Sequence, residues 1–344
     1  MLAPPQPVSI RPRAMANWLL GVAGLVFVMI IVGGITRLTE SGLSITRWDP
    51  VTGAIPPLND ADWEAAFALY RDSPQYSQVN RGMTLADFKF IYFWEYIHRL
   101  LGRLIGLAFA LPLLWFALKR AIPRGYGWKL GALLALGGLQ GAVGWWMVAS
   151  GLVDQPEVSH VRLAVHLLMA LAIFGLLIWV AMDLRTLLRS PVARPARVGL
   201  TAIWALSLLA VQMLFGAYVA GLEAGYAFNT WPLMGDELYP AAAPWMEPFV
   251  RNFVDNPILV QFVHRWMAFV AGGVIALLAW QAYRRGHAKA AAMLFAAVTL
   301  QIALGIATIM SGVQLWLGVA HQGMAALLLA ALVVTAHRLG ERGA

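Results

Sequence analysis

An uncharged stretch near the C-terminus, Ala290–Ala336, reads AAAMLFAAVTLQIALGIATIMSGVQLWLGVAHQGMAALLLAALVVTA. The stretch contains 47 residues. As one helix it would extend about 70 Å, whereas a hydrocarbon core of roughly 30 Å needs only about 20 apolar residues. It therefore predicts two membrane helices that fold back on each other, with the turn at Ser311-Gly312.

Six further segments are long and apolar enough to cross a bilayer. Four of them carry no charge, and these are Trp18–Thr36, Leu130–Val153, Leu163–Met182 and Val198–Leu222. Ile91–Leu118 and Pro257–Tyr283 carry charges only in their first halves. Together with the C-terminal pair, they predict an all-α polytopic membrane protein with eight transmembrane helices.

The composition agrees with a membrane protein. Of 344 residues, 60% are hydrophobic and 12% are charged, whereas a soluble globular protein carries about 25% charged residues. The mean hydropathy of +0.69 excludes a disordered chain as well. The chain has no Cys, which excludes disulfides, iron–sulfur clusters, thiolate zinc sites and thiol catalysis.

The distribution of charge predicts the orientation. Of the 25 Lys and Arg residues, 15 lie on the side of the N-terminus, in short loops and tails. Only two of the 17 acids, Asp183 and Glu341, share that side. The positive-inside rule then places both termini in the cytoplasm. This distribution makes the lipid bilayer, and not a nucleic acid, the predicted partner of a chain with net charge +8.

The N-terminal 17 residues contain four prolines and two arginines and lead straight into the first span. They resemble neither a cleavable signal nor a transit peptide, so we expect a bacterial inner membrane protein. Two long outer loops, roughly 37–89 and 223–256, follow the first and fifth spans. In the first loop we expect a surface helix over Asp60–Arg71 with Asp60 as its N-cap, and a capping box at Thr84–Asp87.

The chain contains an internal repeat. Four collinear matches link its halves: Gly33–Gly42 with Gly216–Gly225, Tyr96–Arg99 with Phe262–Arg265, Leu139-Gln140 with Leu300-Gln301, and His166 with His321. Each half contains four spans and therefore has the same topology. We predict two tandem pseudo-symmetric four-helix bundles, residues 1–190 and 191–344.

Four of the seven histidines repeat and fall inside spans: His98, His166, His264 and His321. An ionisable residue in a span is a functional candidate by default, although a hydrogen-bonded core histidine remains the alternative for any one of them. Paired imidazoles with no Cys and no acid at i+3 or i+4 favour haem iron in a four-helix bundle over zinc or di-iron. The first pair would hold one haem and the second pair another. A small residue follows each histidine at i+4, namely Gly102, Ala170, Ala268 and Ala325.

Charged residues beside these histidines are further candidates. Arg99 and Arg265 directly follow a histidine and would bind haem propionates or, alternatively, lipid phosphate. Glu95 lies at i−3 from His98, a spacing that permits a hydrogen bond to the imidazole. His160, His287 and His337 have no repeated partner, and we interpret them as bystanders.

Glu40 ends the first span, and Glu223 is its equivalent in the second half. If Glu40 packs at a dehydrated haem edge, its pKa is raised and it can exchange protons near neutrality. The alternative is a helix-end acid that lies in water or pairs with Arg37.

These motifs resemble the haem A synthase family, in the branch shared by proteobacteria and mitochondria. The matching stretches are Gly33–Ile45, Glu95–Arg103, Arg162–Leu167, Asn229–Met234 and Gln261–Arg265. The resemblance covers nearly the whole chain. It implies an enzyme that oxidises a ring methyl of haem O, through hydroxylated intermediates, to the formyl group of haem A for cytochrome oxidase.

The resemblance also implies how the sites divide. His98 and His166 would hold the substrate haem O, while His264 and His321 would hold a permanent haem B. Glu40 matches the family's essential acid, and Glu223 matches a residue of less defined role. Implied partners are the farnesylating haem O synthase, oxidase assembly factors and a second copy of the chain. The rival interpretations are a di-haem, quinol-linked electron carrier of the b type and a transporter or channel.

Overall fold

The computed structural model describes residues 11–49, 52–153, 155–190 and 194–340. Three of the expectations fall outside the described residues. They concern the first ten residues, the boundary between the two predicted bundles after residue 190, and Glu341. Among the described residues, eight helices are long and apolar enough to cross a membrane, which confirms the predicted number. They are α1 Pro12–Leu38, α4 Leu85–Leu118, α5 Gly127–Val148, α6 His160–Leu187, α7 Leu200–Gly221, α9 Pro257–Arg284, α10 Ala288–Met310 and α11 Leu315–Leu339.

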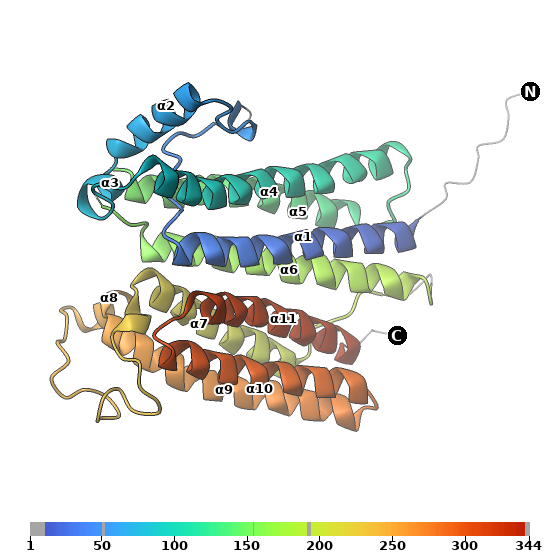
Figure 1. Cartoon of the computed structure of the whole chain (residues 1–344). Helices are drawn as coiled ribbons and strands as arrows, with labels where there is room; N and C mark the ends of the chain where they lie inside the picture. The colour runs from blue at the N-terminus through green and yellow to red at the C-terminus, as the bar shows by residue number, and fades with distance from the viewer. Residues whose placement is uncertain (1–10, 50–51, 154, 191–193, 341–344) are drawn as a thin grey trace, which may run out of the picture.

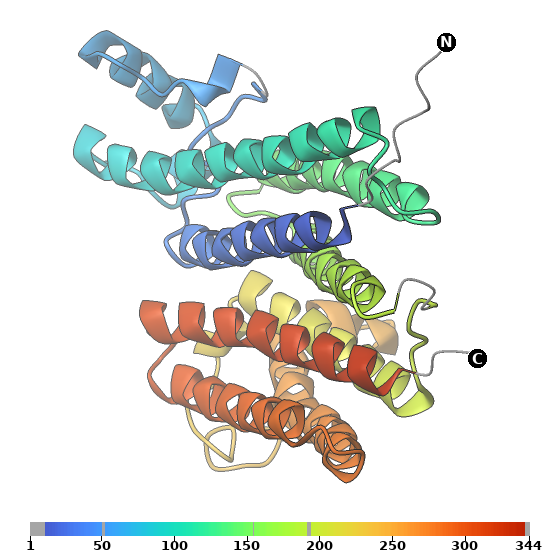
Figure 2. The same ribbon diagram turned by 90° about the vertical axis from the view of Figure 1, so that its right-hand side faces the viewer.

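The long helices run side by side in two groups (Figure 1). Helices α1, α4, α5 and α6 contact one another in a closed ring, and α7, α9, α10 and α11 form the second group. The groups meet along a seam where α6 contacts α7 and α11, and α1 contacts α11 (Figure 2). Helices α4, α5 and α10 are mostly exposed on the outside, as expected for helices that face lipid.

The turn between α10 and α11 is at the predicted position. Helix α10 ends at Met310, and both Gly312 and Val313 have positive φ angles. Glycine adopts such angles without steric cost. The uncharged stretch from Ala290 to Ala336 therefore forms two antiparallel helices.

Helix α4 is 34 residues long, about 51 Å at 1.5 Å per residue, and so extends beyond a bilayer at one end. The predicted capping box between Thr84 and Asp87 opens it. Pro112 lies inside α4 and has no N–H to donate to the carbonyl of Ala108. The indole Nε1 of Trp18 on α1 donates to that carbonyl instead, at 2.8 Å, which ties the two helices together.

The outer loop before α4 forms a small domain of its own. Helix α2 spans Asp60–Arg71 as predicted, but its N-cap is Asn59, not Asp60. Asn59 has extended backbone angles, and its side chain accepts a hydrogen bond from the Asp62 N–H. Helix α3 (Pro74–Gln78) follows. A buried hydrophobic cluster packs α2 against the start of α4, and its members are Phe67, Tyr70, Phe88 and Ile91.

Glycines permit close packing at the seam. A Cβ on Gly34 would lie 3.1 Å from the Gln322 Nε2 atom, and that atom donates to the Ile30 carbonyl at 2.7 Å. A Cβ on Gly323 would clash with the Ile31 side chain. Small residues let membrane helices approach closely, so α1 and α11 join the two groups of helices here.

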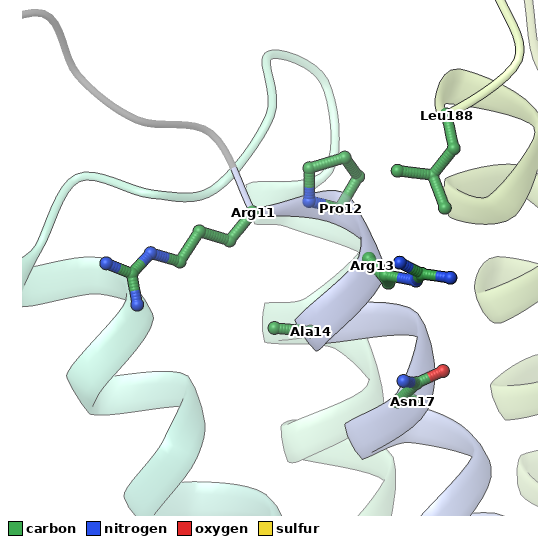
Figure 3. Close-up of a pocket in the computed structure, with 6 residues that line it drawn as sticks. All are labelled: Arg11, Pro12, Arg13, Ala14, Asn17 and Leu188. Carbon is green, nitrogen blue, oxygen red and sulfur yellow. The ribbon is translucent and has the colours of Figure 1, made fainter.

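A cavity of 510 Å³ lies at the start of α1, at the opposite end of that helix from Gly33. Arg11 and Arg13 line it, and Leu188 reaches it from the end of α6 (Figure 3). None of the candidate histidines lines it.

Candidate functional site

The four repeated histidines form two facing pairs. The ring centroids of His98 on α4 and His166 on α6 lie 6.5 Å apart, and those of His264 on α9 and His321 on α11 lie 6.4 Å apart. An iron–nitrogen bond of about 2 Å and a ring radius of about 1.1 Å would place two axial imidazoles with centroids roughly 6 Å apart. The separation within both pairs therefore fits imidazoles that would hold the iron of one haem.

A glycine of a neighbouring helix packs against each imidazole. A Cβ on Gly144, Gly216 or Gly305 would lie 2.9 Å from the Cε1 atom of His166, His264 or His321, respectively. A Cβ on Gly33 would lie 3.4 Å from His98 Nε2. Real Cβ atoms do not approach within 2.9 Å, so three of the four ring positions require glycine.

Glutamine side chains hold three of the rings. The Nε2 atom of Gln140 lies 3.1 Å from His166 Nδ1 and donates to its carbonyl at 3.0 Å. Gln212 makes the same two contacts with His264, at 3.0 and 2.9 Å. Gln301 lies 3.3 Å from His321 Nδ1.

The Oε1 atoms of these glutamines, Gln140, Gln212 and Gln301, are all buried without a hydrogen-bond partner. A histidine that binds a metal through Nε2 donates its Nδ1–H to an acceptor. A rotated carboxamide would place Oε1 at that nitrogen as its acceptor, and at Gln140 and Gln212 it would give up the bond that Nε2 donates to the histidine carbonyl. The glycine contacts, the ring separation and these oxygens all fit a haem between each pair.

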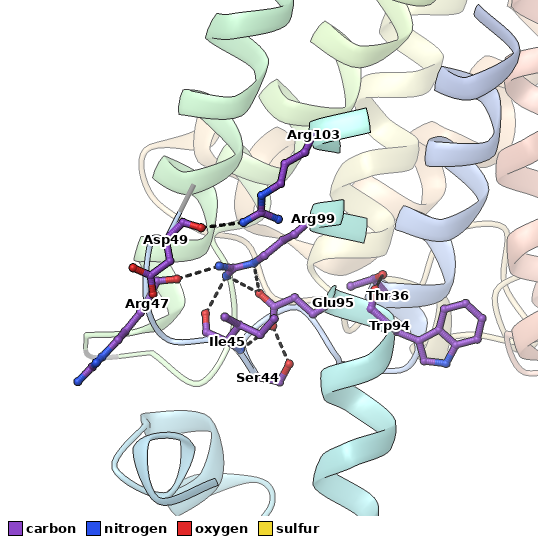
Figure 4. Close-up of polar contacts among 9 residues, drawn as sticks. All are labelled: Thr36, Ser44, Ile45, Arg47, Asp49, Trp94, Glu95, Arg99 and Arg103. Carbon is purple, nitrogen blue, oxygen red and sulfur yellow. Dashed lines mark hydrogen bonds and ion pairs between the residues drawn. The ribbon is translucent and has the colours of Figure 1, made fainter. Parts of the chain in front are cut away.

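Arg99 and Glu95 of α4 hold the loop that follows α1 (Figure 4). Arg99 donates to the carbonyls of Ile45 and Arg47 at 2.7 and 2.9 Å. Glu95 is only 3% exposed, and it accepts from the Ser44 hydroxyl and the Ile45 N–H and pairs with Arg99. The hydrogen bond from Glu95 to His98 that the spacing permits is not made in this structure, because both carboxylate oxygens contact the loop and Arg99.

The second half repeats this clamp. Arg265 donates to the carbonyls of Phe228 and Thr230 at 2.9 and 2.8 Å. Gln261, the equivalent of Glu95, also donates to Phe228. Both arginines, predicted as propionate partners, therefore position loops, although the Nε of Arg265 is buried and unpaired.

Glu40 and Glu223 occupy the same backbone position, each with φ of 53°. Glu223 pairs with Arg37 of the other half at 3.2 Å. Glu40 is exposed, and its carboxylate makes no hydrogen bond to any described residue; its carbonyl accepts from Gln75. Glu40 follows the last turn of α1, and its exposure corresponds to the alternative of a helix-end acid that lies in water.

The family model described as cytochrome oxidase assembly protein matches residues 16–333. The haem A synthase of Rhizorhabdus wittichii is 55% identical over 343 residues, which cover 99% of this chain and 98% of the relative. Those of Sphingopyxis alaskensis and Rhodospirillum centenum are 52% and 50% identical, cover 98% of this chain, and are themselves covered to 95% and 91%. This chain belongs to the haem A synthase family. The resemblance predicted from its motifs is confirmed.

Sequence reasoning missed one group of residues in this member of the haem A synthase family. Gln140 and Gln301 entered the sequence analysis only as repeat matches. Each lies four residues before a glycine that packs on an imidazole, and so on the same helix face as that glycine.

Two of the histidines interpreted as bystanders join the halves instead. His160 pairs with Asp255 at 3.2 Å, and His337 pairs with Asp183 at 3.0 Å.

Proposed function

We propose that this chain is an enzyme that oxidises the ring methyl of haem O to the formyl group of haem A. The observation that carries the proposal is the presence of two imidazole pairs, 6.5 and 6.4 Å apart, in a member of the haem A synthase family. A bound haem supplies the oxidation–reduction chemistry of its iron. The protein's part is to bind, orient and exchange protons.

In this proposal His98 and His166 hold the substrate haem O, and His264 and His321 hold a permanent haem B. The difference between the two acids supports the assignment. Glu223 is paired with Arg37, whereas the carboxylate of Glu40 is free in the described structure and belongs to the first half. Converting a methyl to a formyl group releases protons, and the free carboxylate of Glu40, at the end of the helix whose Gly33 packs against His98, can accept them.

The orientation is also part of the proposal. The excess of Lys and Arg on the side of the termini supports a cytoplasmic location for both ends in a bacterial inner membrane. Both histidine pairs then lie toward the periplasmic side, where the outer loops are. Haem O synthase, oxidase assembly factors and a second copy of the chain are the proposed partners.

The test is chromatography of the haems extracted from the purified protein. Wild type should yield haem B, haem O and haem A. Glu40→Gln should keep both haems bound and lower haem A at least tenfold, because it removes the proton acceptor. Glu64→Gln, on the exposed face of α2, is the control and should match wild type.

Three results would contradict the proposal. Haem B alone in the wild-type extract would favour the di-haem electron carrier. Colourless protein would favour a transporter. Full conversion by Glu40→Gln would remove Glu40 from the mechanism.

A further inference from the structure

One of the four histidines lacks the glutamine that holds the others. In three cases a glutamine lies four residues before the glycine that packs on the ring: Gln140 before Gly144, Gln212 before Gly216, and Gln301 before Gly305. The residue four positions before Gly33 is Met29. The internal repeat aligns Met29 with Gln212, because both pairs of residues, 29 and 212 as well as 33 and 216, differ by 183.

Met29 cannot do what Gln212 does. A thioether has no N–H group and is only a weak acceptor. The side chain is half-buried and extends toward α4, where its Cε atom lies 3.4 Å from the position of a Cβ on Gly102, one turn after His98. In the part of the chain that the structure describes, no hydrogen bond reaches the His98 ring, whereas Gln212 contacts both Nδ1 and the carbonyl of His264.

This difference changes how firmly each ring is held. Hydrogen-bond partners of a ligating histidine fix its orientation and raise its basicity, and their loss costs about 10- to 100-fold in metal affinity. The second half has both rings held, by Gln212 and Gln301. The first half has one held ring, His166, and one unheld ring, His98.

We propose that Met29 makes His98 the labile axial ligand, so that haem enters and leaves the first half at His98 while His166 keeps its hold. The inference rests on the two haem sites of the proposed function. It gives a physical reason why the first site exchanges its haem and the second retains it. A substrate site must release its product, and a cofactor site must not.

The experiment exchanges the two residues between the halves. Purified, haem-loaded full-length Met29→Gln, Gln212→Met and wild type are mixed with excess apomyoglobin, and the rate of haem transfer is followed by absorbance. His166→Ala, which loses the first site, assigns the phases. Wild type should show a fast phase from the first half. Met29→Gln should slow it about tenfold or more, and Gln212→Met should accelerate the slow phase by a similar factor.

Two further measurements keep the test decisive. Met29→Leu has a similar volume without a hydrogen-bonding group and should transfer haem at the wild-type rate. A slowing as large as in Met29→Gln would assign the effect to packing and overturn the proposal. Electron paramagnetic resonance of ferric Met29→Gln should show a changed low-spin signal from the first haem only.

The failures can be told apart. If wild type gives no low-spin signals of paired imidazoles, both this inference and the proposed function are wrong. If both signals are present but the reciprocal variants transfer haem at unchanged rates, only the role of Met29 is overturned.

Discussion

At the scale of single residues, the imidazoles are positioned by contacts from the helix beside them. His166 and His321 each have a glycine against Cε1 and a glutamine against Nδ1. The glycine fixes where the ring can lie, and the glutamine fixes its rotation. A substitution at either position acts on the ring without removing it.

Gly144→Ala tests the glycine contact. Its new Cβ would lie 2.9 Å from His166 Cε1, so the ring must shift. Overpacking of this kind costs about 1–3 kcal/mol. We expect the variant to lose most of the haem of the first half and to keep that of the second, as measured by absorbance per mole of protein.

Gly141→Ala is the matched control on the same helix, because a Cβ there meets nothing within 4 Å. It should keep both haems. Gly305→Ala should show the opposite loss, in the second half. If Gly144→Ala retains its full haem content, the glycine contact does not position His166.

The same scale shows what sequence can and cannot predict. The histidine pairs could be predicted from the internal repeat, because each pair of matching histidines implies equivalent positions in the two helix bundles. The clamp by Glu95 and Arg99 does not follow, since it depends on the path of residues 44–47 back across α4. Spacing along one helix suggested His98 as a partner of Glu95, whereas its partners are Arg99 on the same helix and two loop residues about 50 positions away in sequence.

At the scale of helices, the bilayer made the prediction reliable. Its thickness fixes the length of every span, so the length of the run at 290–336 was enough to require a turn. Helix ends were less predictable. The N-cap of α2 is Asn59, whereas Asp60 was predicted. Both side chains can cap a helix, and only the backbone angles distinguish them.

The bond from Trp18 to the free carbonyl of Ala108 gives a prediction about two helices. Trp18→Phe should lower the melting temperature in detergent by roughly 2 °C, since one hydrogen bond contributes about 1 kcal/mol. Pro112→Ala supplies the missing N–H within α4. In the Pro112→Ala background, Trp18→Phe should lower the melting temperature clearly less than in wild type, and a double-mutant cycle measures the difference. Equal losses in both backgrounds would show that the bond contributes nothing.

At the scale of the whole molecule, Asp183 joins the halves at the cytoplasmic end proposed here. Its carboxylate is 1% exposed and contacts Lys129 of α5 at 3.1 Å and His337 of α11 at 3.0 Å. It also accepts from the Ala196 N–H, in the segment between the halves. One buried side chain therefore holds three parts of the chain.

Asp183→Leu should strongly destabilise the protein, by about 3 kcal/mol or more, because Lys129 is left without its partner. The double variant Asp183→Leu/Lys129→Leu should recover part of the loss, since no unpaired charge remains. Thermal unfolding in detergent measures both, with the exposed Asp236→Asn as control. A double variant less stable than the single one would argue against this view.

Three acids, Glu40, Glu157 and Glu223, interact at the outer end of the seam. They predict a pH dependence of stability. Partial desolvation raises the pKa of Glu157 above its ordinary value of 4.5, and Glu223 and Glu40 raise it further while Arg37 lowers it. A raised pKa means that the folded protein favours the protonated form, so stability is lost as pH rises through that pKa. Glu157→Gln should therefore melt higher than wild type at neutral pH, with the advantage vanishing near pH 4. An advantage independent of pH would contradict this origin.

The adjacent glycines of α1 face in two directions. Gly33 lies against His98, and Gly34 lies against Gln322, the neighbour of His321. One turn of α1 therefore touches a residue of the first imidazole pair and the sequence neighbour of a residue of the second. Any effect that filling one pocket has on the affinity of the other through this turn must be matched by an equal effect in the reverse direction.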